Sequence, residues 1–452
     1  GIVHGTTITI LNAARKIDPK AKDLNGKIFI TSGLGGMSGA QAKAAVIAKG
    51  VCIVAEINSS ALNKRYNQGW VDEIFTNTDT LLERAILARE NKEAVSLAYN
   101  GNIVDLLERV VELNINIEIG SDQTSLHNPW AGGYYPVGIS FENANKMISN
   151  DPDNFKKEVK KTLIRHTNAI NILVKRGMYF FDYGNAFLLE SSRAGADILN
   201  EKGNFKYPSY IQDIMGPMCF DYGFGPFRWV CTSNKPKDLE ITDNIARNTL
   251  EDLIKCSPSE IKLQMHDNIN WIKAAKENNL VVGSQARILY ADAQGRINIA
   301  EAFNKAIKEG VLSAPVILGR DHHDVSGTDS PYRETSNIYD GSNFTSDMAI
   351  QNVIGDSFRG ATWVSIHNGG GVGWGEVING GFGMLLDGSQ AASEKLKSML
   401  FWDVNNGISR RSWARNKEAN FAIIEAMNKN PKLKVTMPNK ADDNLIDSLE
   451  IK

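Results

Sequence analysis

The chain has 452 residues, of which 42% are hydrophobic and 23% charged, and its formal net charge at pH 7 is −2. This length allows two or three domains with a large core, and the even charge balance argues against nucleic acid as a partner. The sequence contains no apolar run of ~18 residues and no basic-then-apolar leader, so we expect no membrane partner.

The four cysteines form no C-x-x-C pair and do not have the spacing of a zinc site. We therefore expect reduced thiols, a cytoplasmic location and no metal site. The sequence begins with Gly1-Ile2-Val3 instead of methionine, and we expect that an N-terminal portion of the protein is missing from it.

The first predicted unit is a strand, a glycine-rich turn and a helix. An apolar run at Ile28–Ile30 precedes the turn, and alanine-rich residues at 40–48 follow it. The turn contains Gly33, Gly35, Gly36 and Gly39. Glycines let a backbone approach a pyrophosphate, and the helix N-terminus presents free N–H groups to it. The pattern is G-x-G-G-x-x-G instead of G-x-G-x-x-G, and a tight turn that binds nothing is the alternative interpretation.

An acidic residue ends the next predicted strand. The apolar run Val51–Ala55 leads to Glu56, twenty positions after Gly36. A nucleotide-binding βαβ unit places a carboxylate for the ribose hydroxyls ~20 residues after its glycines. The segment from 27 to 56 therefore predicts a nucleotide site.

Strands and helices continue to alternate after Glu56. We expect helices at 80–88 and 103–112, and strands at 94–98 and 115–119. This alternation predicts an α/β fold with a doubly wound, Rossmann-like parallel sheet. The loops 33–38, 100–103 and 122–127 would leave the carboxyl ends of strands together, where ligands bind in such sheets.

A long amphipathic helix is predicted at 155–175, and Gly177 is placed to end it. His166 falls on its apolar stripe, so we interpret it as a core histidine instead of a ligand. The run from Phe180 to Asp182 then predicts another strand. The glycine- and proline-bearing stretch 207–226 is typical of a domain junction.

The C-terminal half is predicted to form a second α/β domain. Its expected elements are helices at 238–255 and 299–309 and strands at 281–290, 316–318 and 361–366. After Asn428 the sequence turns polar and lysine-rich, which indicates a surface tail. The expected divisions are 1–212, 213–430 and 431–452.

Two segments of this half carry candidate chemistry. Arg228 lies among aromatic residues, where a guanidinium could clamp a carboxylate or form a structural ion pair. The run Arg320-Asp321-His322-His323-Asp324 favours an acid–base role for Asp321 or His322 over a metal site, because adjacent extended residues point opposite ways. The sequence has no P-loop, no H-E-x-x-H and no G-x-S-x-G motif, which argues against the familiar NTPases, zincins and serine hydrolases.

Taken together, the segments resemble the urocanase family. The matching segments, in the family's order, are GLGGMSGAQ, SDQTSLHNPWAGGYYPVG, FDYGN, GPFRW, LSAPVILGRDHHD, SPYRET and ATWVSIHNGGGVGWG. The resemblance spans roughly residues 1–428. It implies a Rossmann-like NAD⁺-binding domain joined to a catalytic core, and a homodimer.

The family's chemistry implies a hydro-lyase of histidine degradation. It adds water to urocanate to give 4-imidazolone-5-propionate, with tightly held NAD⁺ as an electrophile instead of a hydride carrier. In such an enzyme the protein supplies position and electrostatics.

The resemblance also assigns residues. The implied substrate and catalytic residues are Arg228 for the carboxylate, Asp321 near the ring, and Arg333. The implied NAD⁺ contacts are Gly36, Met37, Ser38, Glu56, Asn102, Ile103, Gln123, Thr124, Ser125, Leu126, His127, Tyr134, Tyr135, Tyr183 and Gly371.

The sequence departs from the family pattern at particular places. Ala61 stands where bacterial members carry an NAD-binding arginine, and Arg65 is the expected replacement. Leu289 stands where bacterial members carry a cysteine long regarded as catalytic, and we expect that this thiol is not required. The family's N-terminal segment, which supplies further contacts, does not match any part of this chain.

Two other functions stay open at this point. A conventional NAD-dependent dehydrogenase is supported only by the glycine turn and Glu56. A non-catalytic NAD-binding relative is suggested by Leu289 and by the unmatched N-terminal segment.

Overall fold

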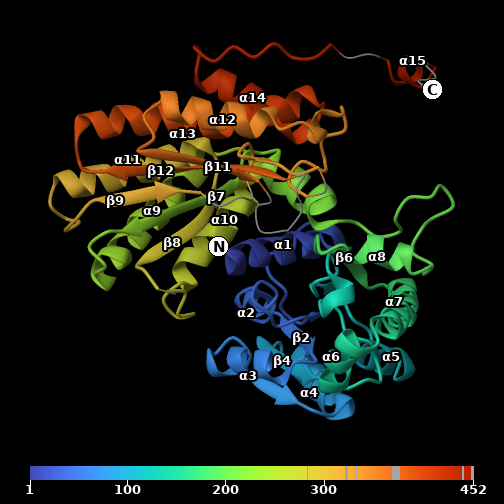
Figure 1. Cartoon of the computed structure of the whole chain (residues 1–452). Coiled ribbons are helices and arrows are strands. Elements are labelled where there is room, and N and C mark those ends of the chain that lie inside the picture. Colours follow the sequence, from blue (N-terminus) through green and yellow to red (C-terminus); the bar gives the residue numbers. More distant parts are fainter. Residues whose placement is uncertain (282, 321–323, 332, 369–376, 440–441, 449–452) are drawn as a thin grey trace. The chain divides into compact units, whose positions relative to one another are not determined.

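The computed structural model describes residues 1–281, 283–320, 324–331, 333–368, 377–439 and 442–448. The chain divides into two compact units, Gly1–Met215 with Pro258–Val281 and Gly216–Ser257 with Val282–Lys452. Figure 1 labels the elements of both along the chain. Among the described residues, no helix combines the length and the apolar composition of a membrane span.

The first unit is built on a six-stranded sheet in which every described strand pair is parallel. Its spatial order is β3 (Glu73–Phe75), β4 (Val95–Asn100), β2 (Val51–Glu56), β1 (Ile28–Ser32), β5 (Ile119–Asp122) and β6 (Tyr179–Asp182). From β1 the chain first adds strands on one side, and then crosses to add β5 on the other. A sheet of this kind opens a ligand crevice at the carboxyl ends of the two strands where the order reverses.

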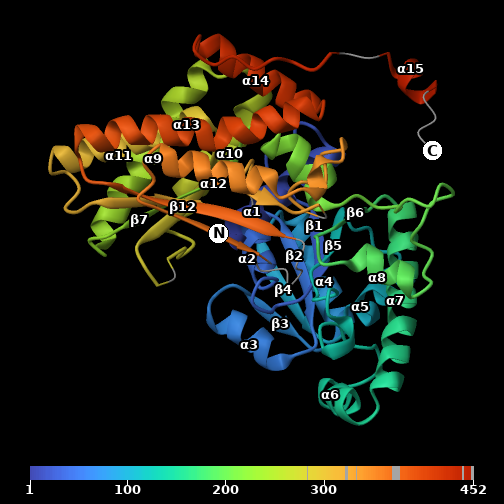
Figure 2. The same cartoon turned by 45° about the horizontal axis from the view of Figure 1, so that its top comes forward.

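Helices cover both faces of this sheet, which makes it doubly wound. The helices of the unit are α1 (Ile2–Ile17), α2 (Ala40–Ile47), α3 (Ser59–Asn67), α4 (Thr78–Glu90), α5 (Ile103–Glu112), α6 (Phe141–Asn150), α7 (Pro152–Lys175), α8 (Phe187–Arg193) and α10 (Ser259–Ala274), with a 3-10 turn at Pro129–Ala131. Residues of α4, α5 and α7 pack with Ile28 and Ile30 in one buried cluster. On the other face Gln41 of α2 accepts a hydrogen bond from Thr31 at 2.6 Å. Figure 2 shows α2 and α5 on opposite sides of the strands.

The segment 258–281 belongs to the first unit because α10 bonds to α1. Arg15 and Asp267 form a buried ion pair at 2.6 Å, and Gln264 donates to Asn12 at 2.7 Å. A buried charge pair with further hydrogen bonds is costly to break, since either partner alone would be left unpaired.

The second unit is built on a sheet whose described strand pairs are all antiparallel. Its order is β10 (Thr328–Asp329), β12 (Ile378–Leu386), β9 (Val316–Gly319), β7 (Gly225–Cys231) and β8 (Ala286–Ala291), and β11 (Trp363–Asn368) pairs with β12. The helices are α9 (Pro236–Cys256), α11 (Ala293–Lys308), α12 (Asp347–Phe358), α13 (Gln390–Trp413), α14 (Lys417–Lys429) and α15 (Asp443–Ser448), with a 3-10 turn at Ser342–Phe344. A π-helix at Tyr210–Phe220 carries the chain from the first unit into the second.

One face of this sheet packs against helices. The Trp229 ring lies 5.3 Å from the ring of Phe303 on α11, and a side chain on Gly380 would meet Val353 of α12. Phe227 and Leu289, paired across β7 and β8, are fully buried. Figure 1 shows α12 and α13 along one side of β12.

A buried charge network ties the helices of this unit to the end of β9. Arg296 pairs with Asp324 and Asp403 at 3.1 and 3.0 Å, and Arg320 pairs with Asp403 at 3.0 Å. All four side chains are inaccessible to solvent. Two of the charged residues in the Arg320–Asp324 run are therefore anchored in the core.

The predicted α/β class with a parallel Rossmann-like sheet is confirmed, and so is His166 as a core residue, with 1% of its surface exposed. The strand predicted at 115–119 lies too early in the chain: β5 runs from Ile119 to Asp122, because its neighbour β1 pairs with it only from Phe29, opposite Ile119, onward. The strand predicted at 281–290 begins at Ala286. Helix α11 begins earlier than predicted, at Ala293, because Asp292 caps it by accepting from the Gly295 amide at 2.8 Å.

Candidate functional site

A cavity of about 230 Å³ opens at the carboxyl edge of the parallel sheet. Its lining comes from the ends of β1, β2, β4 and β5 and from the segment 132–141. This is the switch point where the strand order reverses, so the topology alone accounts for a crevice here. The volume lies just under the ~300–1,000 Å³ of sites that enclose a whole drug-sized ligand.

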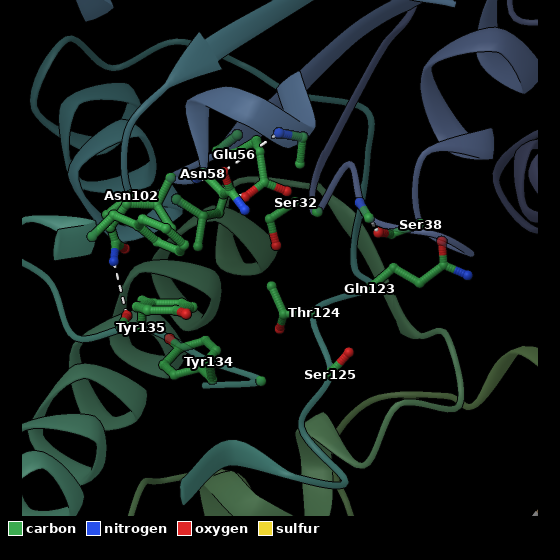
Figure 3. A pocket seen from close by; sticks show the side chains of 18 of the residues that line it. Ser32, Ser38, Glu56, Asn58, Asn102, Gln123, Thr124, Ser125, Tyr134 and Tyr135 are labelled. Carbon is green, nitrogen blue, oxygen red and sulfur yellow. Dashed lines mark hydrogen bonds between the residues drawn. The ribbon is translucent and has the colours of Figure 1, made fainter. Parts of the chain in front are cut away.

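The structure brings together many of the predicted cofactor contacts around this cavity. Those that line it are Ser38, Glu56, Asn102, Ile103, Gln123, Thr124, Ser125, Tyr134 and Tyr135. Figure 3 shows the labelled side chains around the cavity, from strand ends, the glycine turn and the loop that carries Tyr134 and Tyr135.

The other predicted contacts lie elsewhere. Gly36 and Met37 are in the glycine turn beside the cavity, and Met37 is 60% exposed. Leu126 is buried in the core, and His127 is exposed. Tyr183 donates to Thr6 at 2.9 Å. Gly371 and Asp321 fall outside the described residues.

Glu56 ends β2 and is held by backbone amides. Its Oε2 accepts from the Leu34 amide at 2.7 Å and its Oε1 from the Asn58 amide at 2.9 Å. Burial raises the pKa of Glu56, and these amides offset part of the rise because they favour the charged form. Each carboxylate oxygen keeps a lone pair that could accept from a ligand hydroxyl.

The glycine turn leaves space and donors for a ligand. No described atom lies within 4 Å of the place where a Cβ on Gly36 would sit. Gly33 needs its glycine for a different reason, because its φ is +95° and a Cβ would meet Ser38 at 2.9 Å. The Ser38 hydroxyl accepts from the Gly35 amide at 2.9 Å and fixes the turn.

The floor of the cavity is organised by Asp122 at the end of β5. It accepts from Thr124 Oγ1 at 2.5 Å, from Asn185 at 2.8 Å and from Ser32. Asn185 also donates to the Thr124 carbonyl at 2.8 Å. Gln123 is then left with a buried Oε1 that accepts no hydrogen bond from the part of the chain that the structure describes. An unpaired buried acceptor costs free energy, so a ligand donor fits here.

The aromatic side of the cavity is positioned by Asn102 and His166. Asn102 caps α5 by accepting from the Val104 amide at 2.9 Å and donates to the Tyr135 carbonyl at 2.9 Å. The Tyr134 hydroxyl bonds to His166 Nδ1 at 3.0 Å. Burial raises the pKa of Tyr134 and lowers the pKa of His166, so both are neutral.

Sequence reasoning missed several residues that shape this cavity. Ser32, Asn58 and Phe141 line it, and Asp122 and Asn185 hold its floor. Ser32 and Asn58 could have been found from their places at strand ends. Asn185 bonds to a carbonyl 61 positions away, and the sequence carries no signal for that pairing.

The second unit contains the predicted substrate residues. Arg333 forms an ion pair with Glu334 at 2.9 Å. Arg228 is half-buried on β7 and lies directly opposite Gly319 of β9. Gly319 in turn lies opposite Gly383 of β12. Gly383 lies opposite Trp363 of β11. Opposed residues share a face of the sheet. We call the face defined by Arg228, Gly319, Gly383 and Trp363 the Arg228 face.

The Arg228 face has a glycine floor. The Trp363 ring occupies the space that a side chain on Gly383 would need, and a Cβ on Gly319 would touch only the Phe382 carbonyl among the described atoms. Three strand steps of ~4.8 Å separate the Arg228 and Trp363 backbones by roughly 14 Å. Leu289 lies on the opposite, helix-packed face, because it pairs with Phe227 and is fully buried.

Within the described ranges, no group of three or more His, Cys, Asp or Glu side chains is arranged to hold a metal ion.

The parallel sheet, its glycine turn and the cavity at its switch point define the Rossmann-like class of α/β proteins, which bind nucleotides at this edge. Residues 1–214 match the sequence-family model described as the urocanase Rossmann-like domain, and residues 217–425 match the urocanase C-terminal domain. The chain belongs to the urocanase family.

Curated relatives align with nearly the whole chain. A probable urocanate hydratase of Dictyostelium discoideum is 58% identical over 455 residues, covering 99% of this chain and 67% of that protein. A probable urocanate hydratase of Caenorhabditis elegans is 56% identical, covering 100% of this chain and 68% of that protein. The urocanate hydratase of Mus musculus is 55% identical, and the match covers 98% of this chain and 67% of that protein.

Proposed function

We propose that this chain is a urocanate hydratase of histidine degradation, which adds water to urocanate to give 4-imidazolone-5-propionate. The observation that carries the proposal is 55–58% identity to urocanate hydratases along nearly the whole chain. A planar acid of this kind needs a cation for its carboxylate and a flat surface for its ring.

We propose that residues 1–212 bind NAD⁺ and residues 213–430 bind the substrate. The unpaired Gln123 Oε1, the open space at Gly36 and the backbone-held Glu56 carboxylate support a dinucleotide in the cavity. The cavity volume suits one enclosed half of that cofactor. The remaining predicted contacts, including Tyr183 and Gly371, stay part of this proposal.

When bound, NAD⁺ would supply an electrophilic nicotinamide that draws electrons from the imidazole ring so that water can add. Glu56 would accept from the ribose hydroxyls, and Gln123 Oε1 would accept from a cofactor donor. The turn amides would face the pyrophosphate. These groups fix the cofactor's position and do not themselves react.

On the Arg228 face, the guanidinium of Arg228 would hold the propenoate carboxylate through paired hydrogen bonds. Gly319 leaves room for a flat ring against the backbone, and the Trp363 indole, which covers Gly383, bounds that space at the far side. Asp321 would hold or deliver a proton at the ring, and Arg333, held by its ion pair with Glu334, would complete the substrate site.

We also propose a homodimer in the cytoplasm. The family resemblance supports the dimer. The location is supported by the four cysteines, which are all free thiols. Light scattering on the purified chain tests the dimer.

The function is tested by mixing the purified chain with urocanate and NAD⁺ and following ultraviolet absorbance. We expect loss of the conjugated urocanate chromophore with no accumulation of NADH. Accumulation of NADH would instead identify a dehydrogenase. An unchanged spectrum with NAD⁺ bound would identify a non-catalytic relative.

A further inference from the structure

Arg65 makes an unusual set of contacts behind the glycine turn. It lies on α3, is 8% exposed and does not line the cavity. Its Nε donates to the Leu34 carbonyl at 3.2 Å, and its Nη2 donates to the carbonyls of Gly35 and, at 3.3 Å, Gly36. The guanidinium therefore collects consecutive backbone oxygens of the turn.

The rest of the guanidinium is fixed by its own helix end. Nη1 donates to Gln68 at 2.7 Å, and the charged group lies 5.1 Å from the centre of the Trp70 ring. These partners hold the guanidinium plane, so that its donors face the turn and not the cavity. Arg65 is thus placed to shape the turn and not to touch a ligand.

The direction of the carbonyls sets the direction of the amides. In a planar trans peptide the C=O and N–H groups point opposite ways. Because the carbonyls of Gly35 and Gly36 point to Arg65, the amides of Gly36 and Met37 point away from it. Neither amide donates to any atom in the described part of the chain. Successive unpaired amides of this kind form a concave anion site.

Gly39 is the glycine that admits Arg65. A Cβ at this position would lie 2.1 Å from Nε and 2.7 Å from Cζ of Arg65. Any larger residue at position 39 would displace the guanidinium. The last glycine of G-x-G-G-x-x-G, Gly39, is therefore explained by an arginine of α3.

We propose that Arg65 is a positioning residue for diphosphate binding, which turns the Gly36 and Met37 amides toward the pyrophosphate of a dinucleotide. The inference rests on the proposed NAD⁺ site. It differs from the expectation that Arg65 replaces a direct NAD⁺ ligand at position 61, because its donors are already directed at the turn. Its charge adds attraction for the anion from behind the turn.

The test compares a ligand with a diphosphate and one without. The full chain and the variants Arg65→Gln and Arg65→Lys, each first freed of bound nucleotide as checked by mass spectrometry, are titrated with ADP-ribose by calorimetry and with adenosine by ligand-observed NMR. We expect Arg65→Gln to weaken ADP-ribose at least tenfold and adenosine less than threefold. Arg65→Lys keeps the charge but not the planar set of donors, and it should fall between the wild type and Arg65→Gln.

Arg84→Gln is the matched control, because Arg84 is also a paired arginine of the first unit, and its bonds within the described part of the chain go to Glu73 and Glu93 and not to the turn. It should bind both ligands as the wild type does. Failure of the wild-type chain to bind ADP-ribose would overturn the proposed cofactor. Normal ADP-ribose binding by Arg65→Gln, or equal loss of both ligands, would overturn the positioning role. If Arg65→Gln does not fold, the test rests on Arg65→Lys. For this variant too, the loss of affinity for ADP-ribose should exceed the loss of affinity for adenosine.

Discussion

Replacing Glu56 with glutamine tests the nucleotide site most directly. Both carboxylate oxygens accept backbone amides, from Leu34 and from Asn58. Glutamine offers one acceptor and one donor group, so one of these amides would face another N–H. The ribose hydroxyls would also lose a charged acceptor, which costs about 1.5–3 kcal/mol. At ~1.4 kcal/mol per tenfold, Glu56→Gln should weaken ADP-ribose roughly 10- to 150-fold.

The assay is a calorimetric titration with ADP-ribose and with its 2′-phosphate derivative. The Glu56 carboxylate repels a 2′-phosphate, so Glu56→Gln should shift the affinity ratio toward the phosphorylated ligand. Glu73→Gln is the control, because Glu73 pairs with Arg84 outside the cavity lining. A fall in both affinities by the same factor, or no change in either, would refute the assigned role of Glu56.

The same site predicts a pH dependence. Burial raises the pKa of Glu56 above its ordinary value of 4.5. The charged form is the acceptor, so ADP-ribose affinity is complete above the raised pKa and is lost as the pH falls through it. The loss should begin at a higher pH than an exposed glutamate would give, and Glu56→Gln should abolish it.

Other substitutions test the remaining assignments. Arg228→Ala should lower kcat/KM for urocanate about 100-fold, as expected for a lost charged hydrogen-bond pair. Mass spectrometry should find NAD⁺ still bound to this variant, and loss of the cofactor would contradict the substrate role. Leu289→Cys should cost about 1–3 kcal/mol in urea unfolding, as a shortened buried side chain does, and leave kcat unchanged, whereas a higher kcat would restore a role for the thiol. Burial and the nearby Asp122 raise the pKa of Asp182 to about 7. The folded state then holds a proton that the unfolded chain releases near pH 4, so stability falls as the pH rises to 7, by up to about 4 kcal/mol. Asp182→Asn should remove this slope between about pH 4 and pH 7, and a slope that persists in the variant would rule out Asp182 as its source.

The parallel sheet could be predicted because its strands and helices repeat simple periods. The apolar run before Gly33 and the alanine-rich run after it correspond to β1 and α2. The prediction of a strand at 115–119 was wrong because of the neighbouring strand, β1. Ile115 and Ile117 are buried, as their alternation predicts, but no strand extends beside them.

The second unit was harder to predict from the sequence, because its strands and helices depart from those simple periods. β12 contains Gly380, Gly381 and Gly383, which weaken strand propensity, yet the structure needs Gly380 for the close approach of Val353 and Gly383 for that of Trp363. α13 buries charged and polar side chains, including Asp403 and Arg411, so it has no clean apolar stripe. Only the tertiary partners explain why those residues are inside.

The cavity lining was predictable where a residue follows a strand end, as Glu56 and Gln123 do. The residues that orient the lining were not. Arg65 donates to carbonyls 29–31 positions away in the sequence, and Asn185 donates to the Thr124 carbonyl, 61 positions away. Such contacts depend on how helices and loops fold back onto the sheet, and that is decided by packing instead of local pattern.

The position of Leu289 bears on which face of the second sheet can do chemistry. Side chains alternate along β8, so any residue at 289 points into the helix-packed core with Phe227. Cys231 of β7 points to that core, and burial raises the pKa of its thiol. A cysteine at 289 would be held protonated by the same desolvation and would be a poor nucleophile. The proposed substrate residues are therefore sought on the Arg228 face, where the half-buried Arg228 lies opposite Gly319.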